Sequence, residues 1–290
     1  MKIAVTGASG FVGKHVLAAL RSHDAQIYAV TRDASRLRNE IDASVQVVEM
    51  DIYHPAANAF EQLGCPDVLI HLAWDGLPNY KSLHHFETEL PRQYNFLKGL
   101  VESGLPAMLV TGTCFEYGMQ SGELSEDMLA QPNNPYGYAK NALRQQLQYL
   151  QSTRPFRLTW ARLFYMYGEG QAASSLYPQL KAAALRGDKV FNMSGGEQLR
   201  DYLPIEAVSR LIVDMSMHPS GIGLVNVCKG HPISVRHLVE GWVKTLEMDI
   251  ELNLGHYPYP DYEPMAFWGD RNKIDQTLGL LTVNDGRYIP

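Results

Sequence analysis

Short apolar runs alternate with segments of helical period along most of the chain. The run KIAVT (2–6) is apolar, rich in β-branched residues and stops at Gly7, which is typical of a buried strand. The apolar positions that follow recur at helical spacing: Phe11, Val12, Val16, Leu17 and Leu20. The same pattern predicts further strands at 26–30, 45–50, 67–74, 106–113, 156–164 and 223–228, and long helices at Phe86–Glu102 and Tyr136–Leu150.

The predicted strands are apolar on both faces, and helices separate them. A strand with two apolar faces must be covered on both sides, so this order predicts an α/β fold with a Rossmann-like, doubly wound parallel sheet. After Gly168 the pattern becomes irregular. We therefore expect a smaller C-terminal substrate-binding lobe over the carboxyl edge of the sheet. The predicted Rossmann domain covers residues 1–165 and about 200–228, and the lobe covers 166–199 and 229–290.

Composition narrows the class of protein. The 290 residues are 46% hydrophobic, which is ample for a large core, and the net charge of −6 predicts neither a nucleic-acid nor a membrane partner. The three distant cysteines, Cys65, Cys114 and Cys228, have no metal-ligand spacing and imply no disulfide framework, so no metal is expected. Because no signal-peptide pattern and no stretch of membrane-spanning length occurs, we expect a cytoplasmic protein.

The turn after the first strand reads VTGASGFVG. Gly7, Gly10 and Gly13 allow a sharp bend and the close approach of a pyrophosphate, and the following helix offers free N–H groups and the positive end of its dipole. The spacing is G-x-x-G-x-x-G. Glycines also suit a plain structural turn, but the strand before and the helix after favour a dinucleotide site.

The end of the second strand bears on the choice of dinucleotide. An acid there would bind a ribose 2′-hydroxyl, whereas this chain places Arg32 before Asp33, with Arg36 and Arg38 following. A guanidinium suits a 2′-phosphate, so NADP(H) is favoured over NAD(H) for the Rossmann domain. The alternative is an ordinary solvated loop. Asp51, after the third strand, could accept a hydrogen bond from the adenine amino group or could only cap a turn.

The segment NNPYGYAKNALRQQ holds two tyrosines close to one lysine. On a helix, residues four apart share a face and residues two apart do not, so Tyr136 can stand beside Lys140 while Tyr138 points elsewhere. A neighbouring ammonium favours the phenolate and should lower the pKa of Tyr136 toward the working range. Tyr136 is therefore the candidate acid.

Together these motifs resemble the extended short-chain dehydrogenase/reductase superfamily. The resemblance covers nearly the whole chain and includes TGTCFEYG (111–118), HLAW (71–74), NFLKGLVESG (95–104), RLFYMYGEG (162–170) and GGEQLRDYLPIEAV (195–208). It implies that Thr113 binds the substrate carbonyl and that Tyr136 and Lys140 also contact the cofactor, Lys140 through the nicotinamide ribose. The other cofactor contacts that it implies are Ser9, Phe11, Val12, Ile52, Leu72, Ala73 and Trp74. It makes His71 structural rather than catalytic.

The resemblance also implies substrate contacts. Arg200 matches an arginine that holds the pyrophosphate of a sugar nucleotide; the alternative is a surface pair between Arg200 and Asp201. Tyr165 stands where the family usually has a substrate-binding asparagine. Glu89 replaces another asparagine, and Glu169 replaces a proline. These departures leave the Tyr–Lys chemistry intact and concern how the sugar and the nucleotide are held.

Within this family, several reactions use the same machinery. Dehydratases carry an Asp–Glu pair directly after the catalytic threonine, where this chain has Cys114 and Phe115. In epimerase-reductases of the GDP-fucose type the cysteine comes one position later, so Cys114 is interpreted as a small core residue facing the other way on a strand. The chain most resembles bacterial reductases of nucleotide-linked 4-keto-6-deoxyhexoses. This predicts hydride transfer from NADPH to C4, with Tyr136 as proton donor.

Two alternatives stay open. A nucleotide-sugar 4-epimerase would keep NAD tightly bound and let its substrate rotate; Arg32 and the short lobe argue against it. A non-enzymatic NADP-binding sensor or regulatory subunit typically lacks the Tyr–Lys pair, which this chain retains.

The resemblance further implies a homodimer through a four-helix bundle of the helices at 86–102 and 136–150. The candidate apolar stripe consists of Leu90, Leu97, Val101, Leu143, Leu147 and Leu150. Such stripes also occur as plain core. His84, His85 and Tyr80 follow a polar stretch, and we expect a solvated loop there rather than a border of the sugar pocket.

Overall fold

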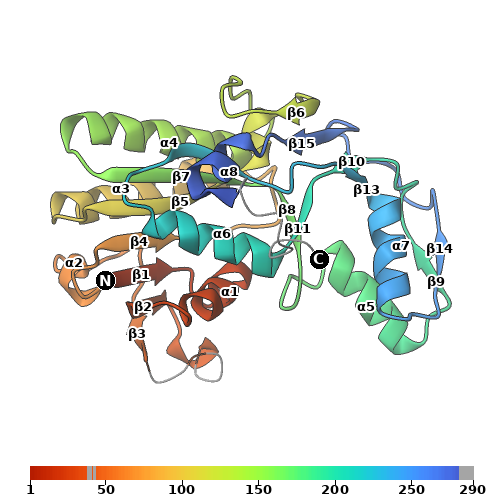
Figure 1. Ribbon diagram of the computed structural model, residues 1–290, viewed down its shortest axis with the longest axis horizontal. Coiled ribbons are helices and arrows are strands. Elements are labelled where there is room, and N and C mark those ends of the chain that lie inside the picture. The colour runs from red at the N-terminus through yellow and green to blue at the C-terminus, as the bar shows by residue number, and fades with distance from the viewer. Residues whose placement is uncertain (38–40, 42–43, 281–290) are drawn as a thin grey trace.

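The computed structural model describes residues 1–37, 41 and 44–280. Its centre is a seven-stranded, all-parallel sheet in the order β12-β7-β5-β4-β1-β2-β3 (Figure 1). The strands are β1 (Lys2–Thr6), β2 (Gln26–Thr31), β3 (Val45–Glu49), β4 (Val68–His71), β5 (Ala107–Thr113), β7 (Arg157–Leu163) and β12 (Gly223–Val227). The predicted doubly wound parallel sheet is therefore confirmed, and each predicted strand is present to within a few residues.

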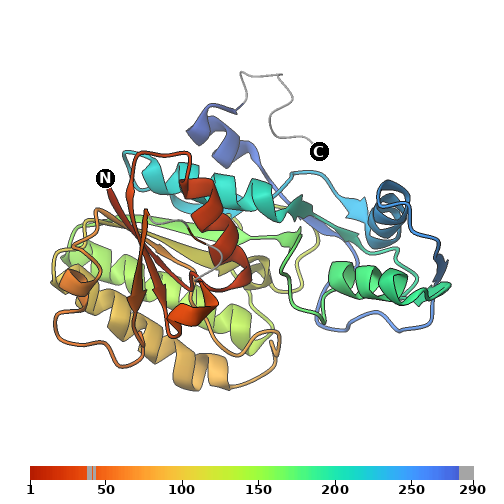
Figure 2. The ribbon, with the colours of Figure 1, turned by 90° about the horizontal axis from the view of Figure 1, so that it is seen from below.

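Helices cover both faces of this sheet (Figure 2). One face carries α1 (Phe11–Leu20) and α6 (Ile205–Met217), and the other carries α2 (Ala59–Gln62), α3 (Leu90–Glu102) and α4 (Pro135–Thr153). Side chains alternate between the two cores along each strand: in β1, Ile3 and Val5 pack toward α1 and α6, whereas Ala4 packs toward the other face. This double burial explains why the strands read as continuous apolar runs.

The two long predicted helices differ from the structure at their ends. The helix expected from Phe86 begins as a π-helical turn, η2 (His85–Glu89), and continues as α3, while α4 extends at both ends beyond the predicted helix. The predicted leucine stripe, moreover, belongs to the chain's own core. Leu97, Leu143 and Leu147 are fully buried between these helices and the sheet. These leucines therefore do not form an exposed dimer surface.

The last third of the chain is more regular than its sequence indicated. It contains α5 (Leu176–Arg186), α6, α7 (Val235–Thr245) and α8 (Asn272–Leu278). The lobe packs α5 and α7 against the parallel pair of β9 (Val190–Asn192) and β14 (Glu251–Asn253). The sequence did not predict its strands, because a strand of two or three residues is too short to show an alternation of apolar and polar positions. Other short strands are β6 (Gly122–Leu124), β8 (Tyr165–Tyr167), β10 (Leu199–Arg200), β11 (Tyr202–Pro204), β13 (Ile233–Ser234) and β15 (Phe267–Gly269).

The C-terminal segment returns from the lobe to the sheet. Ile274 of α8 is fully buried in the core that α1 and α6 share with the sheet. The described end of the chain thus packs on the Rossmann domain, whereas the predicted boundary assigned all of residues 229–290 to the lobe.

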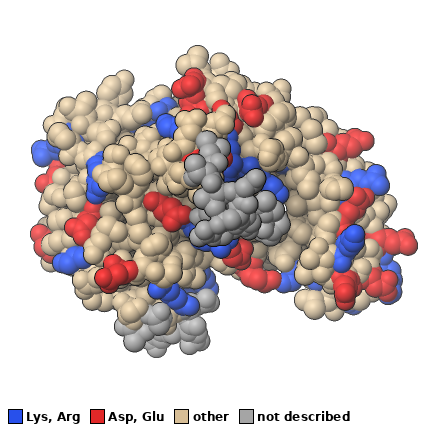
Figure 3. Space-filling view, in the orientation of Figure 1, with Lys and Arg blue, Asp and Glu red and all other residues tan. Residues whose placement is uncertain are grey.

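Apolar packing, rather than surface charge, stabilises the lobe. Acidic and basic side chains are interspersed over the lobe in Figure 3. Exposed pairs there join Arg186 to Asp188 and Arg236 to Glu240, and each such pair contributes little in water. The buried centre instead consists of apolar side chains such as Leu180, Val239 and Trp242. Tyr167 and Tyr177 pack against Trp242 at the edge of this core, with ring centroids 4.9 and 5.0 Å from it.

Candidate active site

The glycine turn lies at the point where the strand order reverses, between β1 and β4. Gly7 has a φ of +68°, and a Cβ there would come within 2.8 Å of the Ala73 nitrogen. A Cβ on Gly13 would lie 2.2 Å from the Gly7 carbonyl oxygen. Gly10 is the N-cap of α1 and provides no side-chain cap, so the first N–H groups of the helix face the crevice. This cradle fits the pyrophosphate of a dinucleotide.

A cavity of about 190 Å³ extends from this turn along the ends of β2 and β3. Its lining includes the predicted cofactor residues Gly7, Ser9, Gly10, Arg32, Arg36, Ile52, Leu72, Ala73 and Trp74. Tyr53 and Asp75 also line it and were not expected. Asp51 does not line it: its carboxylate accepts hydrogen bonds from the Tyr53 amide at 3.0 Å and from His54 at 2.8 Å, so it caps a turn. Arg38 lies outside the described residues.

The acid next to Arg32 is occupied by local hydrogen bonds. Asp33 accepts from the backbone N–H and the hydroxyl of Ser35, at 2.9 and 2.6 Å, and so caps the short helix η1 (Ala34–Arg36). Arg32 is 60% exposed and its guanidinium lies 3.7 Å from Asp75. Arg32, Arg36 and Asp75 therefore line the cavity near the end of β2, whereas Asp33 does not.

A second cavity, of about 430 Å³, joins the first at the glycine turn and holds the three predicted catalytic residues, Thr113, Tyr136 and Lys140. Phe11, Val12 and Gly13 line it as well. The side chains of Tyr136 and Thr113 line this cavity together, and the Lys140 ammonium donates to the Thr111 carbonyl at 3.0 Å. Tyr138 is 53% exposed, as its helical position predicted.

The first turn of α4 fixes this arrangement. Asn134 caps the helix by accepting from the Gly137 N–H at 2.9 Å, and Pro135 follows at the first helical position. A Cβ on Gly137 would lie 2.5 Å from the Phe115 carbonyl oxygen, so only glycine lets α4 approach the turn after β5 this closely.

Burial sets the charges of the catalytic pair. Removal from water lowers the pKa of Lys140 to about 7, against the opposing effect of the carboxylates of Glu116 and Glu89. Burial also raises the pKa of Tyr136, assisted by Tyr80 and Glu116, and the nearby Thr113 hydroxyl only partly offsets this. The expectation that Lys140 lowers the pKa of Tyr136 is therefore wrong, because desolvation is the largest influence on the phenol.

The Tyr136 ring is enclosed by aromatic side chains. Its centroid lies 5.2 Å from His85, 5.6 Å from Tyr80 and 6.0 Å from Trp74, and the Lys140 ammonium lies 4.0 Å above the Trp74 ring. His85 is fully buried, donating to the Asn79 carbonyl and accepting from the Trp74 indole. The expected solvated loop is therefore wrong for His85 and Tyr80, which form a wall of the site.

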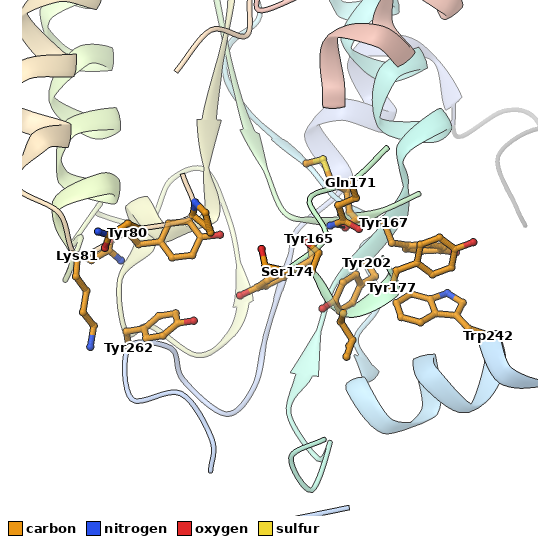
Figure 4. A pocket seen from close by; sticks show the side chains of 16 residues that line it. Tyr80, Lys81, Tyr165, Tyr167, Gln171, Ser174, Tyr177, Tyr202, Trp242 and Tyr262 are labelled. Carbon is orange, nitrogen blue, oxygen red and sulfur yellow. Dashed lines mark hydrogen bonds between the residues drawn. The ribbon is translucent and has the colours of Figure 1, made fainter. Parts of the chain in front are cut away.

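A third cavity, of about 550 Å³, continues from the catalytic one into the lobe and is rich in aromatic side chains (Figure 4). Tyr80, Tyr165 and Gln171 border both cavities. The rings of Tyr167, Tyr177, Tyr202 and Trp242 line the part in the lobe, whereas Tyr262 lies near Tyr80, with ring centroids 6.3 Å apart. Lys81 lies at its edge, where it is largely exposed and pairs with Asp261 at 3.2 Å. The three cavities thus form one continuous path from β2 to the lobe.

Arg200 is buried behind this path. Its guanidinium pairs with Glu263 at 2.8 Å, and Glu263 also accepts from the Tyr165 hydroxyl at 2.5 Å. Asp201 does not pair with it, since that carboxylate accepts from the amides of Lys229 and Gly230. Binding of a pyrophosphate by Arg200 therefore stays a prediction, and it requires Glu263 to give up part of the guanidinium.

Two further findings concern the described residues. None of their helices combines the length and the apolar character that crossing a membrane requires. Nor do their His, Cys, Asp and Glu side chains gather in a group that could hold a metal ion.

The glycine turn makes a direct prediction. Gly13→Ala places a methyl group against the Gly7 carbonyl, so we expect NADPH affinity to fall at least about tenfold, as measured by fluorescence titration. Gly99→Ala is the matched control, because a Cβ there meets no atom within 4 Å. It should leave affinity unchanged and stabilise α3 by about 0.5–1 kcal/mol. Equal affinity in both variants would contradict the assignment of the turn.

Comparison with known proteins supports the same assignment. The sequence profile of the NAD dependent epimerase/dehydratase family matches residues 3–228. A dTDP-6-deoxy-L-talose 4-dehydrogenase (NAD(+)) of Aggregatibacter actinomycetemcomitans is 28% identical over 280 residues, which cover 93% of this chain and 99% of that protein. A GDP-6-deoxy-D-talose 4-dehydrogenase of the same organism is 25% identical, with 99% and 93% covered.

Among solved structures, a UDP-N-acetylglucosamine 4-epimerase from Methanobrevibacter ruminantium M1, in complex with UDP-N-acetylmuramic acid, matches with a TM-score of 0.84. It is 19% identical, and the match covers 95% of this chain and 91% of the other; it establishes the fold. With the family profile spanning most of the chain, the protein is a member of the NAD dependent epimerase/dehydratase family, an enzyme of the extended short-chain dehydrogenase/reductase type.

Proposed function

We propose that the protein reduces the C4 ketone of a nucleotide-linked 4-keto-6-deoxyhexose with NADPH. The observation that carries this proposal is the placement of Thr113, Tyr136 and Lys140 in one cavity that is continuous with the glycine turn. Two relatives are named for 4-dehydrogenation of 6-deoxytalose nucleotides, which is this reaction read in reverse.

The residues act on the substrate oxygen. When bound, the nicotinamide supplies the hydride that C4 receives. Thr113 and Tyr136 line the same cavity, so both hydroxyls can act on one carbonyl oxygen bound between them. As that oxygen gains negative charge, Tyr136 donates its proton and Thr113 holds the oxygen in place. The raised pKa of Tyr136 keeps the phenol protonated at neutral pH, which suits the reductive direction.

The residues after Thr113 argue against dehydration. Cys114 and Phe115 stand where a dehydratase needs an acid pair. Cys114 packs in a core cluster with Tyr117 and Phe164, as expected, but it also borders the catalytic cavity, because β5 ends at Thr113 and strand alternation stops there. Burial raises the pKa of its thiol, so it offers no thiolate base.

The lobe side of the path would hold the nucleotide. The aromatic rings of the third cavity present flat faces on which a base can stack. The catalytic cavity adjoins this one, and Tyr165 lines both. In this assignment Tyr165 contacts the sugar, the Rossmann domain binds the dinucleotide and the lobe binds the nucleotide sugar. A cytoplasmic location stays a prediction from the sequence.

NADPH is the proposed reductant because of the residues that line the cavity at the end of β2. Arg32 and Arg36 line the cavity there, and Asp33 is engaged by Ser35. Two guanidinium groups can bind a 2′-phosphate, and Asp33 is not among the residues that line the cavity. In this proposal the protein differs in its cofactor from the dTDP-6-deoxy-L-talose 4-dehydrogenase, whose name specifies NAD(+).

A second copy of the chain is the proposed partner of α4. Its outer face exposes Tyr138, Gln145 and Tyr149, with Ala142 between them, at the spacing of a helix stripe. A homodimer through α3 and α4 would cover this face.

Catalysis provides the main test. Purified protein is mixed with NADPH and the dTDP, GDP, UDP and CDP forms of 4-keto-6-deoxyglucose, and NADPH absorbance is followed. We expect oxidation with one of them, and a loss on the order of 10²–10⁴-fold in Tyr136→Phe. Tyr138→Phe, the matched control, should retain the rate. An epimerase would isomerise its substrate without net oxidation of NADPH, and a sensor would bind NADPH without consuming it; either result would refute the proposal.

Cofactor choice is tested by Arg32→Ala/Arg36→Ala. Because each charge-assisted hydrogen bond to the 2′-phosphate is lost, we expect kcat/KM for NADPH to fall about 10- to 100-fold and that for NADH to stay nearly constant. Arg186→Ala, on the lobe, is the control. A parallel loss with both cofactors would show that these arginines do not recognise the phosphate.

The assembly is tested by Tyr149→Glu, since Tyr149 is 77% exposed. Light scattering should show a dimer for the wild type and a monomer for the variant, because a charge would be buried at the contact. Tyr257→Glu alters a residue of the lobe that is 54% exposed and should leave the dimer intact. A monomeric wild type would exclude the proposed bundle.

A further inference from the structure

The last three residues of β5 are held from two sides. The Thr111 carbonyl accepts from the Lys140 ammonium at 3.0 Å, and the Thr113 N–H donates to the Glu116 carboxylate at 2.9 Å. Gly112 lies between them. A Cβ there would come within 2.4 Å of the same carboxylate oxygen and 2.2 Å of the Trp160 indole nitrogen, so the glycine makes room for both groups.

Glu116 is the centre of a fully buried polar cluster. It accepts from the Trp160 indole at 2.9 Å and from the Arg162 guanidinium at 2.8 Å, and the Arg144 guanidinium lies 3.9 Å away. The side chains of Glu116 and Arg162 are 0% and 1% exposed. Burying an ion pair carries a large desolvation cost, and apolar residues can often replace one without loss of stability. The charge therefore calls for a role beyond packing.

We propose that Glu116 is a positioning residue of the catalytic site, which fixes the Thr113 backbone and supplies a negative charge opposite Lys140. The proposal rests on the proposed function, in which Thr113 and Tyr136 share the substrate oxygen. Thr113 and Glu116 form a capping box at η3 (Cys114–Tyr117): the Thr113 hydroxyl accepts from the Phe115 N–H while Glu116 holds the Thr113 N–H. These two hydrogen bonds together determine the direction in which the Thr113 hydroxyl points in the catalytic cavity.

The charge of Glu116 also acts on Lys140. The Lys140 ammonium faces the Thr111 carbonyl of β5, the Trp74 ring after β4 and Tyr136 of its own helix. The titratable groups near it are Glu116 of η3, Glu89 and His85 of η2, and His71 of β4. Only the two carboxylates favour the charged ammonium, against burial, which leaves its pKa at about 7. Loss of one carboxylate charge must lower that pKa further, so the ammonium would be lost at a lower pH.

Two variants separate position from charge. Glu116→Gln removes the charge alone and is used for the pKa of Lys140. It leaves Arg162 without a buried partner, so for activity it is combined with Arg162→Met, which removes that unpaired charge. Glu116→Asp keeps the charge and shortens the reach to the Thr113 N–H. Glu126→Gln is the matched control: this carboxylate also accepts a backbone N–H, from Asn226 at 2.7 Å, and does not contact the β5 end.

The pKa of Lys140 is read without substrate, from the pH dependence of its carbamoylation by cyanate, followed by peptide mass spectrometry. We expect a midpoint near 7 in the wild type and in Glu126→Gln. In Glu116→Gln, which removes the carboxylate charge alone, it should fall below the wild-type value, and in Glu116→Asp it should return toward that value.

Activity supplies the second readout. Against the active ketosugar, Glu116→Gln/Arg162→Met should lose on the order of 10²-fold in kcat at unchanged NADPH affinity, although its melting temperature matches the wild type. Glu116→Asp should restore the Lys140 midpoint toward the wild-type pH, but it should regain only part of kcat. Wild-type kcat in the double variant together with an unmoved Lys140 midpoint in Glu116→Gln would overturn the proposal. An inactive wild type would refute the proposed function instead, and the cyanate midpoints would still decide whether Glu116 acts on Lys140.

Discussion

The close approach of α4 to the turn after β5 is the constraint on which the site depends. Gly137 allows it, since any side chain there would meet the Phe115 carbonyl. The cap by Asn134 fixes the direction in which the helix leaves this contact, and the Tyr136 N–H is tied to the Tyr80 carbonyl at 3.2 Å. Tyr136 and Lys140 lie on one face of that helix, so a single backbone contact positions both against Thr113.

The same packing removes the catalytic groups from water, and this determines their protonation. Burial disfavours the charged form of each, so the phenol of Tyr136 holds its proton firmly while the ammonium of Lys140 becomes easier to deprotonate. Glu116 and Glu89 oppose the second effect. A site that keeps the proton on the phenol suits an enzyme that must deliver it to a newly formed alkoxide.

The residues that depart from the family pattern lie around the path of cavities rather than among the catalytic residues. Glu89 accepts from the Asp75 N–H at 3.1 Å and so supports the segment that lines the dinucleotide cavity. Tyr165 borders the catalytic cavity and donates to Glu263, which holds Arg200. Glu169 pairs with Lys181 of α5, and its carbonyl accepts from His15 of α1 at 2.9 Å. Each departure thus affects how a wall of the path is held, while Tyr136, Lys140 and Thr113 remain together.

The sequence by itself determined the strands of the sheet, the glycine turn and the pairing of Tyr136 with Lys140. These features depend on period and spacing within a few residues, and local geometry is enough to read them. Glu116 could have been found in the same way, because T-x-x-E from Thr113 is a capping box. Only the tertiary structure decided that the leucines of α3 and α4 are core, that His85 and Tyr80 enclose Tyr136, and that Glu263 pairs with Arg200. It also decided the direction of the Tyr136 pKa, because desolvation comes from side chains that are distant along the chain and meet only when the lobe and the loops pack over the sheet.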